Sequence, residues 1–425
     1  MTRSAQAASM QGLGVACGLA AGVWLGGAEA PTKLVNAGIS PFAVSLAMVL
    51  GVFTARWTLP TLLKGTNCIF RDVLARPHLI VWAILTGALW AVANTLTVFA
   101  VRDVGLAIAF PLWNVNSLIG IFWGWLLFHE LRGAGLRVGS RVLGGALSIV
   151  ASAIMLAFVT VLHRSTANGH AVQGVLAALG ASLLWGTMYV PFRKAYLSGM
   201  NPLSFVTIFT FGELGTMTLL AATFSGGIAH LNAELHAESH LVFWMFLGGF
   251  CWVIGDLFQQ YAAKYIGIGR GIPLSNTNQL WGLAWSAFVF GELTHVSQAG
   301  RWLVVAATLL MIVGAGSISS AAAPVGEQVS RRTAISRECL RYGLSLEECE
   351  AAQLGAMPRN STHTRRPWWD ALIVTAAVTL FLWLGLQAQV PPLAMNFFWM
   401  STLCAVLALA AIGCGWLLWK KTRFE

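Results

Sequence analysis

The chain has 425 residues, of which 57% are hydrophobic and only 10% are charged, and its formal net charge is +10. Soluble globular proteins average about 25% charged residues, and apolar runs of about twenty residues recur throughout, which excludes a soluble protein with one large core. The basic residues fall in short segments between the apolar runs and form no basic face combined with aromatics, which argues against a nucleic-acid-binding protein.

Ten apolar segments predict the membrane-spanning helices of the main body. They cover residues 10–30, 41–61, 78–100, 104–128, 137–161, 172–192, 202–224, 241–262, 267–290 and 301–320. A polar, Arg-rich segment follows at 321–366, and residues 334–354 are expected to form short helices on the inner membrane surface, attracted by anionic lipid. Two further spans are predicted near 368–389 and 394–419, so the fold class is an all-α integral membrane bundle of ten helices with two extra C-terminal transmembrane helices.

The distribution of Lys and Arg predicts how the chain is oriented in the membrane. Of the 26 basic residues, only Lys33, Arg102, Arg164 and Arg301 fall on the side opposite the N-terminus. Loops rich in Lys and Arg stay in the cytoplasm. We therefore expect a multi-pass protein of the plasma (inner) membrane with both termini in the cytoplasm.

An internal repeat is the strongest feature of the sequence. Residues 86–131 align without gaps to residues 248–293, at a constant offset of 162 positions. The matched pairs include Trp90 and Trp252, Pro111 and Pro273, Asn114 and Asn276, Asn116 and Asn278, Trp123 and Trp285, and Glu130 and Glu292. A weaker match with a one-residue gap joins the first span to the sixth, so the whole ten-span body is expected to be a duplicated unit.

Each copy of the repeat holds five spans, and an odd number inverts the second copy relative to the first. Inverted repeats are typical of secondary transporters, in which the substrate site lies near the midplane between the halves. The predicted domains are the two repeats, 1–165 and 166–320, a cytoplasmic linker at 321–366, and two additional helices with a basic tail at 367–425. The alternative is a duplication that serves folding alone.

The repeat resembles the drug/metabolite transporter superfamily, in which the fourth and ninth spans end in an acidic motif. Here the endings are His129-Glu130 and Gly291-Glu292, and the first departs from the usual Gly-Glu. The stretches 87–90, 104–106 and 110–116 are most similar to the glucose/ribose porter group of sugar transporters. The resemblance covers about residues 10–320 and implies the 5+5 inverted bundle and transport of a small solute. Ureide and rhamnose carriers share this architecture, and the last hundred residues fall outside the family's pattern.

Two carboxylates inside predicted spans are the candidates for proton coupling. Asp256 lies within the eighth span, and Glu213 comes about eleven residues into the seventh, which at ~1.5 Å per residue is close to mid-membrane. An ionisable residue inside a span is costly unless it is paired or faces water, so it indicates function by default. Their counterparts in the first repeat are Asn94 and Val52, and the alternative role for either acid is a structural hydrogen bond.

Amide and tryptophan side chains are the candidates for binding the solute. Sugars need amide donors and acceptors together with a flat ring for stacking, and the Asn pairs of the fourth and ninth spans follow prolines that break helical regularity. The predicted substrate-binding residues are Trp90, Asn94, Trp113, Asn114, Asn116, Trp252, Asp256, Gln260, Asn276, Asn278, Gln279 and Trp281. For any single Trp, helix packing or a place in the interfacial belt is the alternative role.

The sequence therefore predicts a secondary transporter that moves a sugar or similar small polar solute by alternating access, with proton coupling. The alternatives are a nucleobase, ureide or drug exporter of the same fold, or a membrane receptor or structural protein that transports nothing. No enzyme signature and no phosphate-binding loop occurs, so neither catalysis nor a cofactor is expected. The seven Cys have no metal-ligand spacing, and their odd number argues against a disulfide framework. The expected partners are the solute, the lipid bilayer and a second copy of the chain contacting the C-terminal helices, with no nucleic acid.

Overall fold

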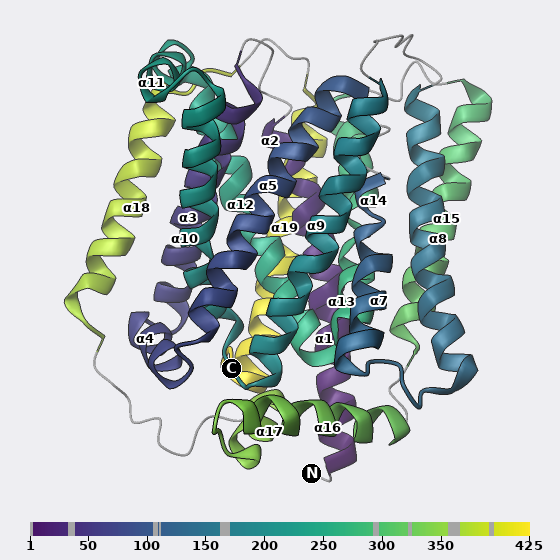
Figure 1. Ribbon diagram of the computed structural model, residues 1–425. Coiled ribbons are helices and arrows are strands. Elements are labelled where there is room, and N and C mark those ends of the chain that lie inside the picture. The colour runs from purple at the N-terminus through teal and green to yellow at the C-terminus, as the bar shows by residue number, and fades with distance from the viewer. Residues whose placement is uncertain are drawn as a thin grey trace.

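The computed structural model describes residues 3–32, 39–104, 109, 112–161, 171–291, 297–321, 325–355, 366–390 and 395–425, and all of its regular elements there are helices. Figure 1 shows them as an upright bundle with two helices lying across its lower end. The helices are α1 (Arg3–Gly27), α2 (Glu29–Thr32), α3 (Pro41–Leu63), α4 (Thr66–Ala75), α5 (Leu79–Val104), α7 (Asn116–Phe128), α8 (Gly135–Val161), α9 (Ala171–Leu197), α10 (Pro202–Phe224), α11 (Ile228–Ala237), α12 (Ser239–Ile266), α13 (Ile268–Ser275), α14 (Asn278–Ala284), the π-helix η1 (Trp285–Val289), α15 (Gln298–Ser319), α16 (Val325–Arg341), α17 (Leu346–Gln353), α18 (Trp368–Gln387) and α19 (Phe397–Thr422).

Ten of the described helices are long and apolar enough to cross a membrane: α1, α3, α5, α8, α9, α10, α12, α15, α18 and α19. The predicted all-α membrane fold is confirmed, and the chain is a multi-pass integral membrane protein. Two of these helices begin in the same way. Ser40 precedes Pro41 and accepts a backbone N–H at 3.3 Å, and Asn201 precedes Pro202 and accepts one at 2.9 Å. A capping oxygen followed by proline suits a helix start, because the proline lacks an N–H that would have no partner there.

The helices of the two proposed repeats pack in corresponding ways. Helix α1 packs on α12 as α9 packs on α5, and α3 packs on α12 as α10 packs on α5. In Figure 1, α3 leads to α4 at the lower end of the bundle, whereas α10 leads to α11 at the upper end, so the two corresponding helices run in opposite directions. This arrangement supports the proposal of an inverted five-helix repeat.

The helices cross at two points of direct backbone contact, each occupied by a pair of glycines. Gly51 of α3 and Gly249 of α12 lie at one crossing, and Gly212 of α10 and Gly87 of α5 lie at the counterpart crossing. A Cβ atom added to any of the four would stand 2.0 or 2.1 Å from a backbone carbonyl oxygen of the opposite helix. Small residues let membrane helices approach this closely, so the four glycines set the distance between the crossing helices.

The predicted fourth and ninth spans, 104–128 and 267–290, are not continuous helices. Turns at Asn114–Val115 and at Asn276–Thr277 interrupt them, so α13, α14 and η1 together replace the ninth span. Pro273 lies shortly before the second turn and lacks the N–H needed for regular helical bonding, while Pro111 lies outside the described residues. The interruptions fall at counterpart positions, and broken helices of this kind are typical of transporter substrate sites.

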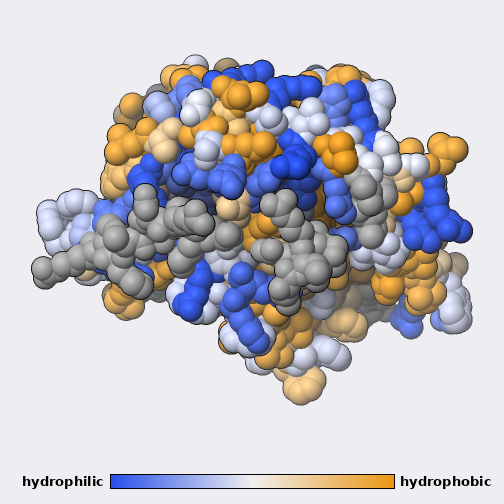
Figure 2. All heavy atoms as spheres, turned by 90° about the horizontal axis from the view of Figure 1, so that it is seen from below, coloured by the Kyte–Doolittle hydropathy of each residue, from blue (hydrophilic) through white to orange (hydrophobic). Residues whose placement is uncertain are grey.

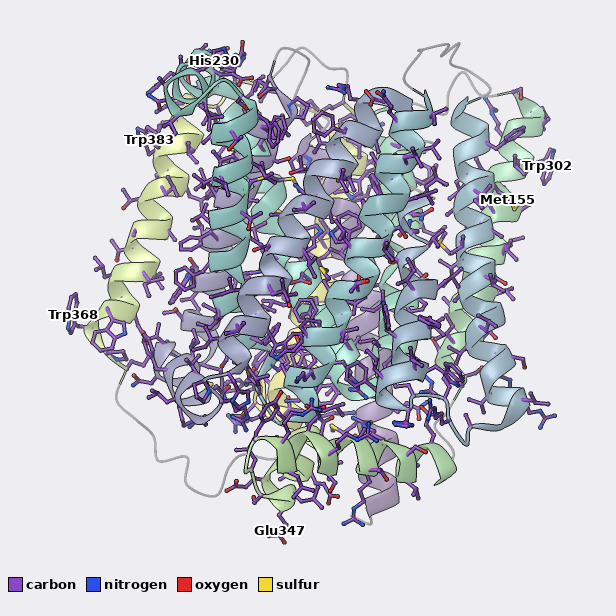
Figure 3. The ribbon with its side chains drawn as sticks, viewed as in Figure 1. Met155, His230, Trp302, Glu347, Trp368 and Trp383 are labelled. Carbon is purple, nitrogen blue, oxygen red and sulfur yellow. A yellow bond between two sulfur atoms is a disulfide. The ribbon has the colours of Figure 1, made fainter. Side chains whose placement is uncertain are left out.

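The two C-terminal helices pack on the outside of the bundle. Helix α18 contacts α3 and α12, and α19 contacts α1 and η1. Figure 3 shows Trp368 near the lower end of α18 and Trp383 near its upper end, both pointing away from the protein, with Trp302 of α15 also pointing outward at the upper level. Exposed Trp side chains at two levels match the aromatic belts found where helices meet the two membrane surfaces.

The polar segment after α15 forms helices as expected, but these helices pack against the protein rather than lying on lipid alone. Helices α16 and α17 run across the lower end of the bundle (Figure 1), and Figure 2 shows hydrophilic side chains gathered over that end. Ala334, Ile335 and Cys339 on α16 are buried in the main hydrophobic core. The apolar face of α16 thus continues the core of the transmembrane bundle.

Charged side chains of α16 fix it to α12 and α13. Arg270 and Glu327 form two hydrogen bonds of 2.5 and 2.6 Å, and both side chains are buried. Arg331 donates to the backbone carbonyls of Lys264 at 3.1 Å and Tyr265 at 3.0 Å. Burial, with Arg193 nearby, lowers the pKa of Arg331 to about 10, so its guanidinium stays charged at neutral pH and can hold these carbonyls.

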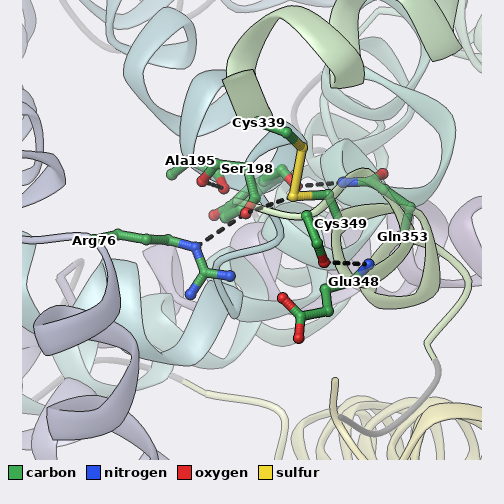
Figure 4. Close-up of a disulfide and its surroundings, with 9 residues drawn as sticks. Arg76, Ala195, Ser198, Cys339, Glu348, Cys349 and Gln353 are labelled. Carbon is green, nitrogen blue, oxygen red and sulfur yellow. Dashed lines mark hydrogen bonds between the residues drawn. A yellow bond between two sulfur atoms is a disulfide. The ribbon is translucent and has the colours of Figure 1, made fainter. Parts of the chain in front are cut away.

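A disulfide joins α16 to α17, contrary to the expectation drawn from the odd number of Cys. Cys339 and Cys349 are bonded, with their Cα atoms 6.8 Å apart (Figure 4), and the other five Cys are free. The backbone carbonyl of Ser198 lies 3.4 Å from the Cys349 sulfur and accepts a hydrogen bond of 3.0 Å from Arg76. The turn between α9 and α10 therefore contacts both α17 and the segment that precedes α5.

The residues that follow α19 pack among helix ends at the lower side of the bundle. The backbone carbonyl of Phe424 accepts hydrogen bonds from the Tyr261 hydroxyl at 2.9 Å and from the Asn201 amide at 2.7 Å. The side chain of Glu425 pairs with Lys64. These contacts attach the end of α19 to α3, α10 and α12.

Candidate functional site

A buried ion cluster joins three helices in the middle of the bundle. Arg56 of α3 donates to Glu213 of α10 at 3.0 Å and to Asp256 of α12 at 2.7 Å, and none of the three side chains is exposed. The guanidinium carbon also lies 4.0 Å from the ring centroid of Phe209 and 5.5 Å from that of Trp252, which allows cation–π attraction. The two predicted coupling carboxylates are thus neighbours that share one cation.

Polar partners extend the cluster toward α9. The Gln260 amide donates to Asp256 at 2.7 Å, and its carbonyl oxygen accepts the Tyr196 hydroxyl at 2.8 Å. Two polar atoms of the cluster, Arg56 Nε and Glu213 Oε1, have no hydrogen-bond partner among the described residues. Buried groups without partners are rare because each one costs free energy, so they indicate a place where a ligand, water or proton can act.

Arg56 is not among the residues predicted for the site, because its position near the end of a span resembles that of a cytoplasmic basic residue. It lies sixteen residues into α3, inside an apolar run that continues to Leu63. The argument applied to Asp256, that a charge inside a span is costly unless paired, would have singled it out. Arg193, Lys264 and Arg270 were also counted as loop residues and are buried in α9, α12 and α13, which corrects the description of the basic residues as lying only between spans.

Two pairs of repeat counterparts touch each other. The ring centroids of Trp90 and Trp252 are 5.2 Å apart, and the Asn276 amide donates to the backbone carbonyl of Asn114 at 3.3 Å and to Asn116 Oδ1 at 3.1 Å. A residue can contact its own counterpart only where it lies near the axis that relates the two copies. Under the proposed inverted repeat that axis lies in the membrane plane, so both contacts would lie at mid-membrane.

Several polar atoms beside these pairs have no partner among the described residues. They are Trp90 Nε1, Asn94 Nδ2, Asn278 Oδ1 and Gln279 Nε2. Trp90, Asn94 and Gln279 are nearly fully buried, whereas Asn278 is half-buried. Donors and an acceptor are therefore both available, which is the combination that a hydroxyl-bearing solute needs.

Two of the predicted binding residues lie elsewhere. The ring of Trp113 packs at 5.8 Å against Trp185 in a separate small apolar cluster. Trp281 packs beside Trp285 and Leu403, where η1 meets α19. Both rings therefore have packing partners, and their role in binding the solute stays a prediction. No group of three His, Cys, Asp or Glu that could hold a metal ion occurs within the described ranges.

Glu130 holds the lower ends of the two halves together. It follows α7, and its carboxylate accepts the backbone N–H groups of Ile268 at 3.2 Å and Gly269 at 2.9 Å, at the start of α13. Arg193 of α9 pairs with the same carboxylate at 2.7 Å. An anion at a helix N-terminus is stabilised by the helix dipole, so Glu130 anchors the end of α7 to α13 and α9. Its counterpart Glu292 lies outside the described residues.

Replacing Glu130 with glutamine should destabilise the purified protein by about 2–3 kcal/mol, because hydrogen bonds to a charged group contribute this much and Arg193 loses its partner. Thermal unfolding in detergent measures the effect. Glu347→Gln is the matched control, since Glu347 on α17 points into solvent at the lower end (Figure 3). Equal melting temperatures for the two variants would contradict the anchoring role.

Comparison with known proteins shows that the second half of the chain is similar to a transporter family. Residues 172–319 match the model of the EamA-like transporter family, which is part of the drug/metabolite transporter superfamily. No curated protein matches the sequence. A solved structure described only as "Crystal structure of protein" matches with a TM-score of 0.51 at 16% identity, covering 72% of this chain and 95% of that chain. That likeness shows the fold alone, and the family match favours no sugar-specific group.

Proposed function

We propose that this chain is a secondary transporter that carries a sugar or similar polyol across the bilayer by alternating access between two inverted halves. The observation that carries the proposal is the contact of repeat counterparts, Trp90 with Trp252 and Asn114 with Asn276, beside buried polar atoms that have no partner among the described residues. A polar, ring-shaped solute needs aromatic rings for stacking and amides for hydrogen bonds, and the two halves supply both. A site shared by both halves opens to the other side of the membrane when the halves move relative to each other.

We place the protein in the plasma (inner) membrane with both termini in the cytoplasm. The start of α1 and the end of α19 lie at the same, lower end of the bundle, where α16 and α17 with their arginines also lie (Figure 1). Proton coupling through Glu213 and Asp256 is part of the proposal, because both are buried inside spans beside a single cation. The second candidate is an exporter of nucleobases, ureides or drugs, which the family match supports equally.

A screen of sugars and polyols against the purified protein tests the proposed substrate class. We expect at least one compound to raise the melting temperature and to drive counterflow in liposomes. The Trp252→Ala variant should weaken that compound's apparent affinity about tenfold, since an aromatic contact contributes roughly 1–1.5 kcal/mol.

Trp302→Ala is the matched control for this substitution, because Trp302 is exposed and points away from the bundle. Its affinity for the solute should equal that of the wild type. Efflux of dyes or nucleobases, without any response to sugars, would favour the exporter instead. A complete lack of response to a broad set of metabolites would favour the receptor or structural protein.

A further inference from the structure

The two carboxylates that share Arg56 are held very differently. Both oxygens of Asp256 are satisfied, one by Arg56 at 2.7 Å and the other by the Gln260 amide at 2.7 Å. Glu213 receives a single bond, from Arg56 at 3.0 Å on Oε2, and its Oε1 has no partner among the described residues. Hydrogen bonds to the charged form of an acid favour ionisation, so the surroundings favour the carboxylate of Asp256 far more than that of Glu213.

The charged groups of the cluster around Glu213 comprise one cation and two carboxylates. On α3 and α12 the charged groups that face it are Arg56 and Asp256, and on α9 Tyr189 and Tyr196 lie within electrostatic range of Asp256. Glu213 is the only charged residue of α10, and the charges of α5, Arg102 and Asp103, pair with each other at the end of that helix. One guanidinium against two carboxylates leaves a net charge of −1 in a buried site, which one added proton neutralises.

We propose that Glu213 takes up and releases the coupled proton, one per transport cycle, while Asp256 stays ionised as the permanent partner of Arg56. This inference rests on the proposed transport function. In this step, a proton from water on one side of the membrane adds to the Glu213 carboxylate. The ion pair between Glu213 and Arg56 then becomes a contact between Arg56 and a neutral acid. On the other side the proton returns to water and the ion pair forms again. A second proton, on Asp256, would leave the site with a net charge of +1. The positive charge of Arg56 therefore limits the site to one proton.

The counterpart positions show that the symmetry-related place in the bundle lacks these three charged groups. In the first repeat, the positions corresponding to Glu213 and Asp256 are Val52 and Asn94, and the position corresponding to Arg56 in the second repeat is Met217. The symmetry-related place in the bundle therefore carries no charge. Each transport cycle then moves one proton. The residues that differ between the two halves therefore fix the number of protons moved per cycle.

Counterflow in liposomes at several pH values tests the assignment. The wild type should show a pH-dependent exchange rate, and Glu213→Gln, which imitates the protonated acid, should exchange at a reduced rate that no longer depends on pH. The same variant should lose accumulation driven by a pH gradient. Asp256→Asn should lose exchange itself, because Arg56 is released from its permanent partner. Glu347→Gln, the exposed control on α17, should retain the wild-type pH profile.

A second measurement does not require a transported solute. Infrared difference spectra of purified protein recorded above about pH 6, where exposed carboxylates stay ionised, should show the carbonyl band of a buried carboxylic acid. This band should be absent in Glu213→Gln and present in the exposed control Glu347→Gln, and it should shift on isotope labelling of glutamate but not of aspartate. A band that persists in Glu213→Gln, or that shifts on isotope labelling of aspartate, overturns the assignment. A wild type with the Glu213 band but no counterflow of any solute overturns the transport function and leaves the protonation site standing. A Glu213→Gln variant with unchanged pH dependence also overturns the proposal.

Discussion

Replacing Arg56 with methionine should abolish transport and destabilise the protein by about 3–5 kcal/mol, the typical result of removing one partner from a buried ion cluster. Glu213 and Asp256 would then face each other in the bundle without a cation. Methionine suits the test because Met217 occupies the counterpart position in the second repeat and is fully buried. Thermal unfolding in detergent and counterflow in liposomes measure the two effects.

A neutral triple variant separates the two roles of the cluster. Arg56→Met combined with Glu213→Gln and Asp256→Asn removes every charge, and it should recover most of the lost stability because no unpaired charge stays buried. Transport should stay absent, since no group can exchange a proton. If Arg56→Met alone keeps the wild-type melting temperature and transports solute, the three residues do not act as one unit.

Adding a methyl group at the crossing of α5 and α10 should destabilise the protein nearly as much as Arg56→Met does. In Gly212→Ala the added Cβ would stand 2.0 Å from the backbone oxygen of Ile84, so the two helices would have to separate. Overpacking of this kind costs roughly 1–3 kcal/mol and more where backbone must move, and we expect about 3 kcal/mol with a matching loss of transport.

The neighbouring glycine on the same helix provides the control. A Cβ at Gly215, three residues along α10, would meet no atom within 4 Å. Because alanine is favoured over glycine in a helix by about 1 kcal/mol, Gly215→Ala should leave the melting temperature unchanged or raise it. Gly51→Ala, at the counterpart crossing, should reproduce the damage of Gly212→Ala. Similar stability for Gly212→Ala and Gly215→Ala would show that the crossings tolerate wider spacing.

The sequence sufficed to predict the membrane fold, since length and apolarity alone define a span. It also indicated that Pro111 and Pro273 disturb helical regularity, but the fourth and ninth spans were predicted as continuous. The sequence could not identify the cation that pairs with the two carboxylates, because Arg56 is separated from Glu213 by 157 residues and from Asp256 by 200. Only packing brings such positions together, and in a charge count Arg56 resembled any other basic residue near a span's end.

The placement of the tryptophans and of the polar segment depended on tertiary structure in the same way. Trp113 and Trp281 were predicted to bind the solute, and each packs in an apolar cluster: Trp113 lies against Trp185 of α9, and Trp281 lies where η1 meets α19. Cys339 and Cys349 are close enough to bond because α17 folds back on α16. A sequence pattern reports which face of a helix is apolar, but it does not report whether lipid or protein covers that face.

The docking of α16 and α17 across the lower end sets the population of any state that opens there. A movement that carries α16 away from α12 and α13 must break the Arg270–Glu327 pair and release the carbonyls held by Arg331. These contacts therefore lower the population of such an open state. A solute that binds only the open state binds with an apparent affinity reduced by that population, so substitutions in α16 should change both the rate of the cycle and the apparent affinity for solute that enters from this side.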